Sequence, residues 1–587
     1  MHVLGVSGLD RAISFREQHY PDIERRERRI TQGLDAAAAL CGPGGILGAA
    51  AEERFTGQKG IERFPARAID ALLAQAGLRL DQIDRIAHGF AYDAVAASLS
   101  PSDEARAEFT RVQSRAAQLE VLREHWGDGP WDERFVQVPH HLAHAASAYY
   151  PSGMDEALVF VSDGMGETES ASVWTGRNGR LAPLASVSHR HSLGVLYGLF
   201  TLHLGFRFNS GEYKVMGLAP YGDPRPYFGQ LSELVRLQDD GFYTIPILQL
   251  NETPLERATY RASSRVIEEL FGAPRRPDEP ISQAHMDLAA ALQAVLQNTT
   301  LHTLRTFKAR TGARHLCMAG GVALNCTANG VVLRSRLFKR TFVQPASGDD
   351  GTALGAALYV QSEREPDAVM QPMSMPFWGT REDEPALRAA LDKPWLEVRR
   401  IDDPAQLVRT TADLLAREQI VGWFQGAMEF GPRALGNRSI LADPRSPTMR
   451  ARVNALVKKR EDFRPFAPAV LAHRAPEFFD IKAGEVETFA HMLYVTGVRA
   501  AYRDALPAIT HCDGSARVQT VFSDRNPRFF QLIEAFEQVT GLPILLNTSF
   551  NVRGQPIVRT AEEAVETFRE ARLDALVIGD YLATLKT

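Results

Sequence analysis

Cysteines are scarce in this sequence, and no two of them are closely spaced. The four, Cys41, Cys317, Cys326 and Cys512, lie far apart and form no Cys-x-x-Cys motif. So sparse a set favours neither a disulfide framework nor a cysteine-based zinc site. We therefore expect the protein to work in a reducing cytoplasm.

Long apolar runs and an excess of basic charge are also missing. No stretch reaches the roughly 20 consecutive apolar residues of a membrane-spanning helix. The first residues, MHVLGVSGLDRAISF, lack the basic segment and apolar run of a signal peptide. The formal net charge of -5 leaves no basic footprint for duplex nucleic acid, although a local basic groove stays open as an alternative. We expect neither a membrane nor a nucleic-acid partner.

What the sequence does contain is ordinary for a large globular enzyme. The 587 residues are 45% hydrophobic and 23% charged. One hydrophobic core does not serve a chain of this length, which predicts two domains or three. Residues 362–394 are rich in proline, methionine and charge, as is typical of a linker. We place the boundary there, with domains at 1–372 and 373–587.

Short β-rich runs alternate with glycine-rich turns and helical stretches, which predicts an α/β fold. Several runs end in a turn rich in aspartate or glycine, where backbone N–H groups and a carboxylate can meet a phosphate or a metal ion. Repeated turns of this kind resemble the actin-like ATPase architecture. Residues 9–33 interrupt the alternation and predict an inserted surface loop or short helix. Residues 3–8 (VLGVSG) predict a buried strand, and the runs with such turns are 157–174 (ALVFVSDGMGETESASVW), 315–325 (HLCMAGGVALN) and 341–360 (TFVQPASGDDGTALGAALYV).

A pair of histidines in the segment HHLAHAASAYY suggests a metal site. His140 and His144 are spaced i, i+4 on a predicted helix, so both imidazoles face one side and could share an ion. His141 lies about 100° round the helix and is not expected to be a third ligand. The alternative is a helix cap and a packed histidine.

Two carboxylates in strand-end turns could complete this metal site. Asp163 lies in SDGMGE and Asp349 in SGDDGTALG. Either would leave coordination positions open for a substrate oxygen. Asp350 competes with Asp349 for the role of ligand, and ordinary Asp-Gly turns are the alternative explanation.

The second half of the chain carries cations among aromatic residues and prolines. Residues 426–445 (GAMEFGPRALGNRSILADPR) contain three arginines, and Lys458 and Arg464 follow beside Phe463 and Phe466. Such a set suits a phosphate-rich ligand, because arginine can donate two hydrogen bonds to its oxygens. The segment LNTSFNVRGQP (546–556) adds neutral donors and acceptors suited to a carbamoyl or phosphate group. A solvated surface run of charge is the alternative.

Taken in order, these motifs resemble the NodU/TobZ family of O-carbamoyltransferases. The likeness spans nearly the whole chain and includes AEERFT (51–56), KVMGLAPYGDP (214–224), EFGPRALGNRSIL and LLNTSFNVRGQPIV. It implies an actin-like (ASKHA, Kae1-like) first domain and a YrdC-like α/β second domain. It also implies that the second domain forms carbamoyl adenylate from carbamoyl phosphate and ATP. The first domain would then pass the carbamoyl group to a hydroxyl of a small natural product, as in antibiotic biosynthesis.

The resemblance assigns roles by motif position. It implies Fe²⁺ or a similar divalent ion in the first domain and Mg²⁺ with ATP. The implied metal ligands are His140, His144 and Asp349, and the implied catalytic residues are His140, His144 and Asp163. Carbamoyl phosphate would meet Arg433, Lys458, Arg464, Arg517 and Ser549, and the nucleotide would meet Lys214, Gly320, Gly321 and Asn325.

One departure from the family pattern concerns the general base. Family members carry a His-Asp pair where this chain has Leu34-Asp35. His19 and His141 are candidate substitutes, and the alternative is that the metal alone acidifies the acceptor hydroxyl. Because the strands flanking residues 9–33 lead toward the expected acceptor pocket, we predict that this insertion forms part of the pocket wall.

Two other functions are compatible with related domains. One is a tRNA threonylcarbamoyl-transfer enzyme, which the mild acidity disfavours. The other is a non-catalytic nucleotide-binding regulator, which the intact set of candidate residues disfavours. The sequence leaves the acceptor open among aminoglycosides, macrolides, ansamycins, β-lactams and lipo-oligosaccharides, and it leaves the oligomeric state open with a homodimer as one option.

Overall fold

The computed structural model describes residues 1–586 except 25, 99–101, 366–370, 459–460 and 462, and it describes only the backbone of Ser98 and Lys458. The chain divides into two compact units. The first comprises Met1–Glu53 and Gly60–Met373, and the second comprises Arg54–Lys59 and Ser374–Thr587. Six residues from the predicted first domain therefore belong to the second unit. Helices and strands alternate in both units, which confirms the mixed α/β class.

The first unit contains two five-stranded sheets of identical topology. In each sheet two antiparallel pairings lead from the central strand to one edge, and two parallel pairings lead to the other. The first strand, VLGV, is buried throughout, as expected of a strand covered on both faces. In spatial order the sheets are β3 (Gly45–Ala51), β2 (Ala37–Gly42), β1 (Val3–Val6), β4 (Arg85–His88), β5 (Phe135–Gln137); and β12 (Arg340–Val343), β11 (His315–Ala319), β6 (Glu156–Ser162), β7 (Glu169–Arg177), β8 (Arg180–Ser188).

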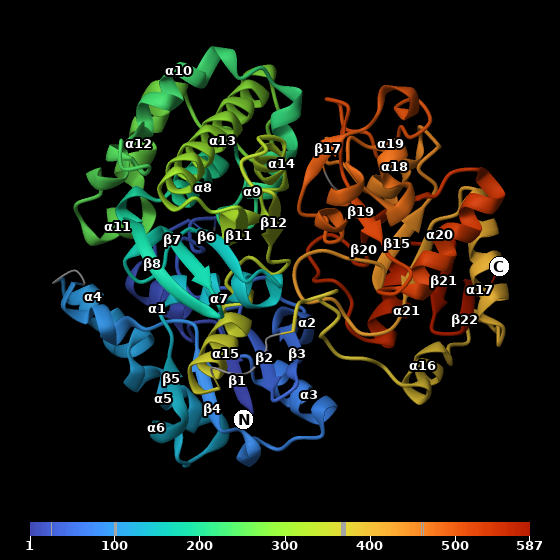
Figure 1. The fold of residues 1–587 in the computed structure, drawn as a ribbon, viewed down its shortest axis with the longest axis horizontal. Helices are drawn as coiled ribbons and strands as arrows, with labels where there is room; N and C mark the ends of the chain where they lie inside the picture. Colours follow the sequence, from blue (N-terminus) through green and yellow to red (C-terminus); the bar gives the residue numbers. More distant parts are fainter. Residues whose placement is uncertain (25, 99–101, 366–370, 459–460, 462, 587) are drawn as a thin grey trace. The chain divides into compact units, whose positions relative to one another are not determined.

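Two helices pack against each other and against the two sheets. Helix α15 (Asp350–Arg364) lies on β1, β2 and β4, and helix α7 (His140–Tyr149) lies on β6 and β11 (Figure 1). Small residues allow this close packing, since a β-carbon at Gly355 would lie 1.8 Å from the carbonyl oxygen of Ala143. Helix α7 carries the two histidines, and Asp349 directly precedes α15. The packing of these two helices therefore sets the position of the candidate site.

Eleven further α-helices of six residues or more lie in the described part of the first unit. The longest, α13, has 29 residues and ends at Gly312 in the left-handed conformation that favours glycine. These helices are α1 (Ala12–His19), α3 (Ala66–Ala76), α4 (Asp103–Glu108), α5 (Arg115–Trp126), α8 (Leu193–His203), α9 (Glu212–Leu218), α10 (Arg225–Leu234), α11 (Pro254–Thr259), α12 (Arg261–Phe271), α13 (Gln283–Thr311) and α14 (Cys326–Arg334).

The second unit is built on one eight-stranded mixed sheet. Helix α17 (Pro404–Ala416) packs against α20 (Pro527–Thr540), and both contribute to a core with Trp423 and Phe536. In spatial order the strands are β13 (Leu396–Arg400), β22 (Tyr581–Leu585), β21 (Ala575–Ile578), β14 (Val421–Phe424), β15 (Arg438–Ala442), β20 (Ile544–Ser549), β16 (Ala467–Leu471) and β19 (Gln519–Val521). The helices α16 (Glu384–Leu391) and α21 (Ala561–Glu570) pack on each other, and β17 (Val495–Gly497) pairs with β18 (Ser515–Arg517).

None of the helices in the described ranges combines the length and the apolar content needed to cross a membrane.

Candidate functional site

The two histidines of the predicted pair lie at the start of α7. Pro139 precedes the helix and fixes the backbone angle that a first turn needs. The spacing of four residues places both imidazoles on one face, and their Nε2 atoms lie 3.1 Å apart. Both side chains have 0% exposure, so this face is fully enclosed by protein.

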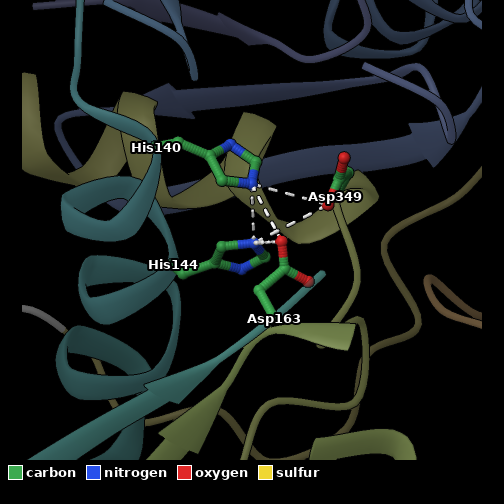
Figure 2. Close-up of side chains that lie close together, drawn as sticks. All are labelled: His140, His144, Asp163 and Asp349. Carbon is green, nitrogen blue, oxygen red and sulfur yellow. Dashed lines mark hydrogen bonds and ion pairs between the residues drawn. The ribbon is translucent and has the colours of Figure 1, made fainter. Parts of the chain in front are cut away.

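Two carboxylates approach the same point from the second sheet and from α15. Asp163 follows strand β6, and Asp349 precedes the first residue of α15. The Nε2 atom of His140 lies 3.5 Å from an oxygen of each carboxylate, and that of His144 lies 4.0 Å from Asp163 and 3.8 Å from Asp349. Four potential ligand atoms thus lie within 4.8 Å of one another (Figure 2).

Neighbouring groups fix the orientation of these side chains. The Nδ1 of His140 donates to the carbonyl of Gly89 at 3.0 Å, which leaves its Nε2 facing the carboxylates. Its ring stacks on Phe90 with centroids 4.1 Å apart. The backbone N–H of His140 donates to Glu167, and that of Gly321 donates to Asp163 at 2.8 Å. Glu167 lies in the DGMGE motif, whose position alone did not reveal this supporting role.

The electrostatics of the four groups favour a bound cation. Burial alone would lower the pKa of His140, but Asp349 and Asp163 raise it well above its usual value. Burial alone would raise the pKa of Asp163, but the two histidines and the Gly321 amide lower it. Carboxylates that attract a proton to a buried imidazole also attract a divalent ion. Two imidazole nitrogens and two carboxylate oxygens suit iron or a similar first-row metal, so the residues fit the predicted ion.

The other candidate ligands face elsewhere. Asp350 accepts the N–H of its neighbour Gly351, and burial together with Asp35 and Glu53 raises its pKa well above the usual value. His141 has its Nδ1 2.8 Å from the hydroxyl of Ser172. The structure therefore places Asp349 in the four-residue group and leaves Asp350 and His141 outside it.

At the departure from the family pattern, an apolar residue and a half-buried acid occupy the position of the His-Asp pair. Leu34 is buried. Burial raises the pKa of Asp35 to about 7, against the lowering effect of Arg29. His19 stacks on Phe15 at the end of α1, with ring centroids 3.8 Å apart.

The insertion at residues 9–33 is more buried than a surface loop. Arg16 has 8% exposure and donates to the carbonyl of Ala258. Near the end of the insertion, Gln32 accepts a hydrogen bond from the hydroxyl of Tyr92 and donates to the carbonyl of Gly166 at 2.5 Å. Gly166 belongs to the turn that begins at Asp163, so the insertion contacts the turn that carries a candidate ligand.

The residues predicted to meet a nucleotide lie in the second half of the first unit. Gly320 follows β11 with φ of +90°, and a β-carbon there would lie 2.2 Å from the carbonyl oxygen of Ser162. The next residue, Gly321, donates its N–H to Asp163. Asn325 caps α14 and exchanges amide hydrogen bonds with Gln293 at 2.9 and 3.0 Å. Lys214 lies on α9, with its ammonium 5.2 Å from the ring centre of Phe206.

In the second unit, Arg433 lies on a loop between β14 and β15 whose backbone is hydrogen-bonded to a buried glutamate of the same loop. One oxygen of Glu429, which is 1% exposed, accepts the N–H groups of Leu435, Asn437 and Arg438 at 2.8 to 3.1 Å. We call residues 429–438 the glutamate-closed loop. The sequence motif pointed to the arginines but not to Glu429. The side chains of Trp423, Gln519 and Asn547 donate to loop carbonyls at Gly436, Leu435 and Ala434, respectively.

The remaining predicted phosphate ligands lie on neighbouring elements of this unit. Ser549 ends β20, faces Ser439 in the register of β15, and donates to Asn551 at 2.7 Å. Arg464 lies 3.8 Å from Glu461. Arg517 ends β18. Burial lowers the pKa of His511 to about 4, and the nearby charges of Arg517 and Arg450 contribute to this shift. The side chain of Lys458 falls outside the described residues.

Comparisons with known proteins match both halves of the chain. A family model described as carbamoyltransferase N-terminus matches residues 31–358, and one described as carbamoyltransferase C-terminus matches residues 412–584. An uncharacterized protein of Synechocystis is 39% identical over 93% of this chain and 94% of its own. Nodulation protein NolNO of Sinorhizobium fredii is 40% identical over 94% of this chain and 79% of its own. Full-length HypF in its phosphate- and nucleotide-bound form aligns with a TM-score of 0.31 and 12% identity, over 62% of this chain and 56% of that chain.

Proposed function

The chain belongs to the carbamoyltransferase family, which confirms the resemblance read from its motifs, and on this premise we propose that it is an ATP-dependent O-carbamoyltransferase acting on a small-molecule alcohol. The second unit activates carbamoyl phosphate. Water displaces its phosphate, and the resulting carbamate attacks ATP, so that carbamoyl adenylate forms and pyrophosphate leaves. In the first unit an acceptor hydroxyl attacks the carbamoyl carbon, and AMP leaves with the bonding electrons.

The observation that carries this proposal is the group of His140, His144, Asp163 and Asp349, of which the first three are buried and Asp349 is partly exposed. A divalent ion held there would supply Lewis acidity for the acceptor hydroxyl. The chain's own residues hold the side chains that would bind it. The Gly89 carbonyl sets the tautomer of His140, and the Gly321 amide holds Asp163. An actin-like fold for this unit is supported by its duplicated sheet topology. A YrdC-like fold for the second unit stays a prediction.

Carbamoyl phosphate carries two negative charges that the second unit can match with arginines. Arg433 lies on the glutamate-closed loop, Arg464 precedes β16, Arg517 ends β18 and Ser549 ends β20. Arginine–phosphate contacts are charge-assisted and difficult to replace. We assign these residues, with Lys458, to carbamoyl phosphate. Lys214, Gly320 and Asn325 are assigned to a nucleotide, with Gly321 acting through its contact with Asp163.

The test separates the two partial reactions. Arg464→Ala should abolish pyrophosphate release in the presence of carbamoyl phosphate and ATP, and supplied carbamoyl adenylate should restore transfer. His144→Ala should keep pyrophosphate release and fail to transfer even from the supplied adenylate. Arg569→Ala, which breaks a comparable i, i+3 ion pair with Glu566, is the matched control and should leave both reactions unchanged.

Two outcomes would overturn this division of labour. One is an Arg464→Ala variant that the adenylate does not rescue. The other is a His144→Ala variant that loses activation as severely as transfer. Acceptors are screened by mass spectrometry for a gain of about 43 Da across a panel of alcohols, because the chemistry of the pocket sets specificity.

A further inference from the structure

A short excursion of the chain belongs to the second unit although the first unit surrounds it in sequence. Residues 54–59 leave the first unit after Glu53 and return to it at Gly60. The base of the excursion is closed, because Glu53 accepts the N–H of Gly60 at 3.1 Å. One residue earlier, Glu52 accepts the N–H of Ala68 at 2.8 Å. The residues on both sides of the excursion are thus tied to the first unit, and the six residues between them belong to the second.

Within the second unit, Arg54 lies beside the glutamate-closed loop. Arg54 is 4% exposed, and its Nη2 donates to the carbonyl of Gly431 at 2.8 Å. The neighbouring Phe55 packs under the guanidinium of Arg559, 4.7 Å from its ring centre. A buried arginine needs compensation for its lost hydration, and this contact with a carbonyl is one part of it.

The carbonyl that Arg54 holds is close in sequence to a predicted phosphate ligand. Gly431 adopts φ of +113°, a conformation that favours glycine, and it lies two residues before Arg433. The carbonyls at 434–436 of the loop are held by side chains from other parts of the second unit. The Gly431 carbonyl, on the opposite flank of Arg433, is held by Arg54 from the first half of the sequence.

The charge around Arg54 also indicates a role beyond packing. Burial lowers the pKa of the fully buried Arg438, Glu429 raises it, and Arg54 lies close enough to lower it further. Two buried cations at one loop cost free energy through their mutual repulsion. They also add positive potential at a loop that would bind a dianion.

We propose that Arg54 is a positioning residue for carbamoyl phosphate, which holds the Gly431 flank of the glutamate-closed loop so that Arg433 meets the phosphate. This inference rests on the proposed function of the second unit. It assigns the AEERFT motif of the first half of the sequence to the activation step.

The test uses the full chain with Arg54→Ala, Arg54→Lys and the matched control Gln58→Ala, an exposed residue of the same six-residue segment. Pyrophosphate release is measured against carbamoyl phosphate and against ATP. Arg54→Ala should raise the KM for carbamoyl phosphate by about 10- to 100-fold, the usual effect of losing a hydrogen bond from a charged donor. Arg54→Lys should recover part of this loss, because an ammonium can still donate to one carbonyl. Gln58→Ala and the KM for ATP should stay unchanged.

Calorimetric titration of each variant with carbamoyl phosphate alone reports binding directly. An unchanged KM and unchanged affinity in Arg54→Ala would refute the positioning role. So would equal losses for both substrates together with a lowered melting temperature in both Arg54 variants, since these indicate a structural role. Wild-type protein that binds carbamoyl phosphate but releases no pyrophosphate would instead refute the proposed activation, and the binding data would still decide the role of Arg54.

Discussion

Replacing His144 by alanine should remove the divalent ion without unfolding the protein. The substitution deletes the imidazole nitrogen that lies 3.1 Å from Nε2 of His140 and 3.8 Å from Asp349. Loss of a residue that only supports a ligand costs about 10- to 100-fold in metal affinity, so loss of a ligand should cost more than about 100-fold. That factor corresponds to about 2.7 kcal/mol of binding free energy.

The matched control is His141→Ala. His141 is the same residue type, lies on the same helix, is 1% exposed, and contacts Ser172 instead of the four-residue group. Truncating either buried side chain should cost stability of a similar order, roughly 2–4 kcal/mol. A comparison of the two variants therefore separates metal binding from the cost of a core cavity.

Metal content is measured by mass spectrometry after dialysis against limiting Fe²⁺, and affinity by titration of the ion. Circular dichroism and thermal unfolding report the fold of both variants. Full metal occupancy in His144→Ala, or a larger loss of metal in His141→Ala, would refute the assignment of ligands. In that case the contacts among His140, Asp163 and Asp349 would be a structural ion-pair network.

Three further predictions follow from contacts in the two units. Gln32→Ala removes the hydrogen bond to the carbonyl of Gly166 and should raise the KM for the acceptor while pyrophosphate release stays unchanged, and unaltered acceptor kinetics would exclude the insertion from the pocket wall. Burial raises the pKa of Glu52 to about 7 from 4.5, so its contribution to stability is complete below pH 4.5 and is lost as the pH rises through 7. In urea unfolding, the free energy of unfolding should fall with rising pH by about 3 kcal/mol less in Glu52→Gln than in the wild type. An identical fall in both proteins would contradict the assignment. Arg438→Met removes a guanidinium that lies 3.6 Å from the ring centre of Phe424 and donates to the carbonyls of Gln425, Gly426 and Asn437. The substitution should lower the free energy of unfolding by about 3–5 kcal/mol. A loss under about 1 kcal/mol in denaturant titrations would show that the buried charge is dispensable.

Local patterns predicted most elements that carry the candidate site. The pattern of a short apolar run followed by an aspartate- or glycine-rich turn predicted β6 and β11 with their turns. The proline before HHLAH predicted the start of α7, and the four-residue spacing predicted that His140 and His144 share a face. These predictions succeed because strand alternation, helix periodicity and proline geometry act over a few residues.

The prediction that the insertion at residues 9–33 lies at the surface differs from the observed burial. The charged and proline-containing insertion at residues 9–33 predicted a loop or short helix at the surface. Helix α1 lies within it, but Arg16 and Phe15 are buried and Gln32 reaches the turn after Asp163. A charged side chain can be enclosed when backbone carbonyls accept its hydrogen bonds, and those carbonyls come from residues far away in sequence.

The sequence by itself determined the α/β class, the paired histidines and the family. Only the tertiary structure placed Asp349 and not Asp350 in the four-residue group, brought Asp163 from the end of β6 to the histidines, and gave the two sheets one topology without a sequence repeat. It also assigned Arg54–Lys59 to the second unit. The physical reason is that secondary structure follows hydrogen bonds and side-chain periodicity within a few residues, whereas the meeting of distant carboxylates, imidazoles and carbonyls depends on how the two central helices and the strands pack into one core.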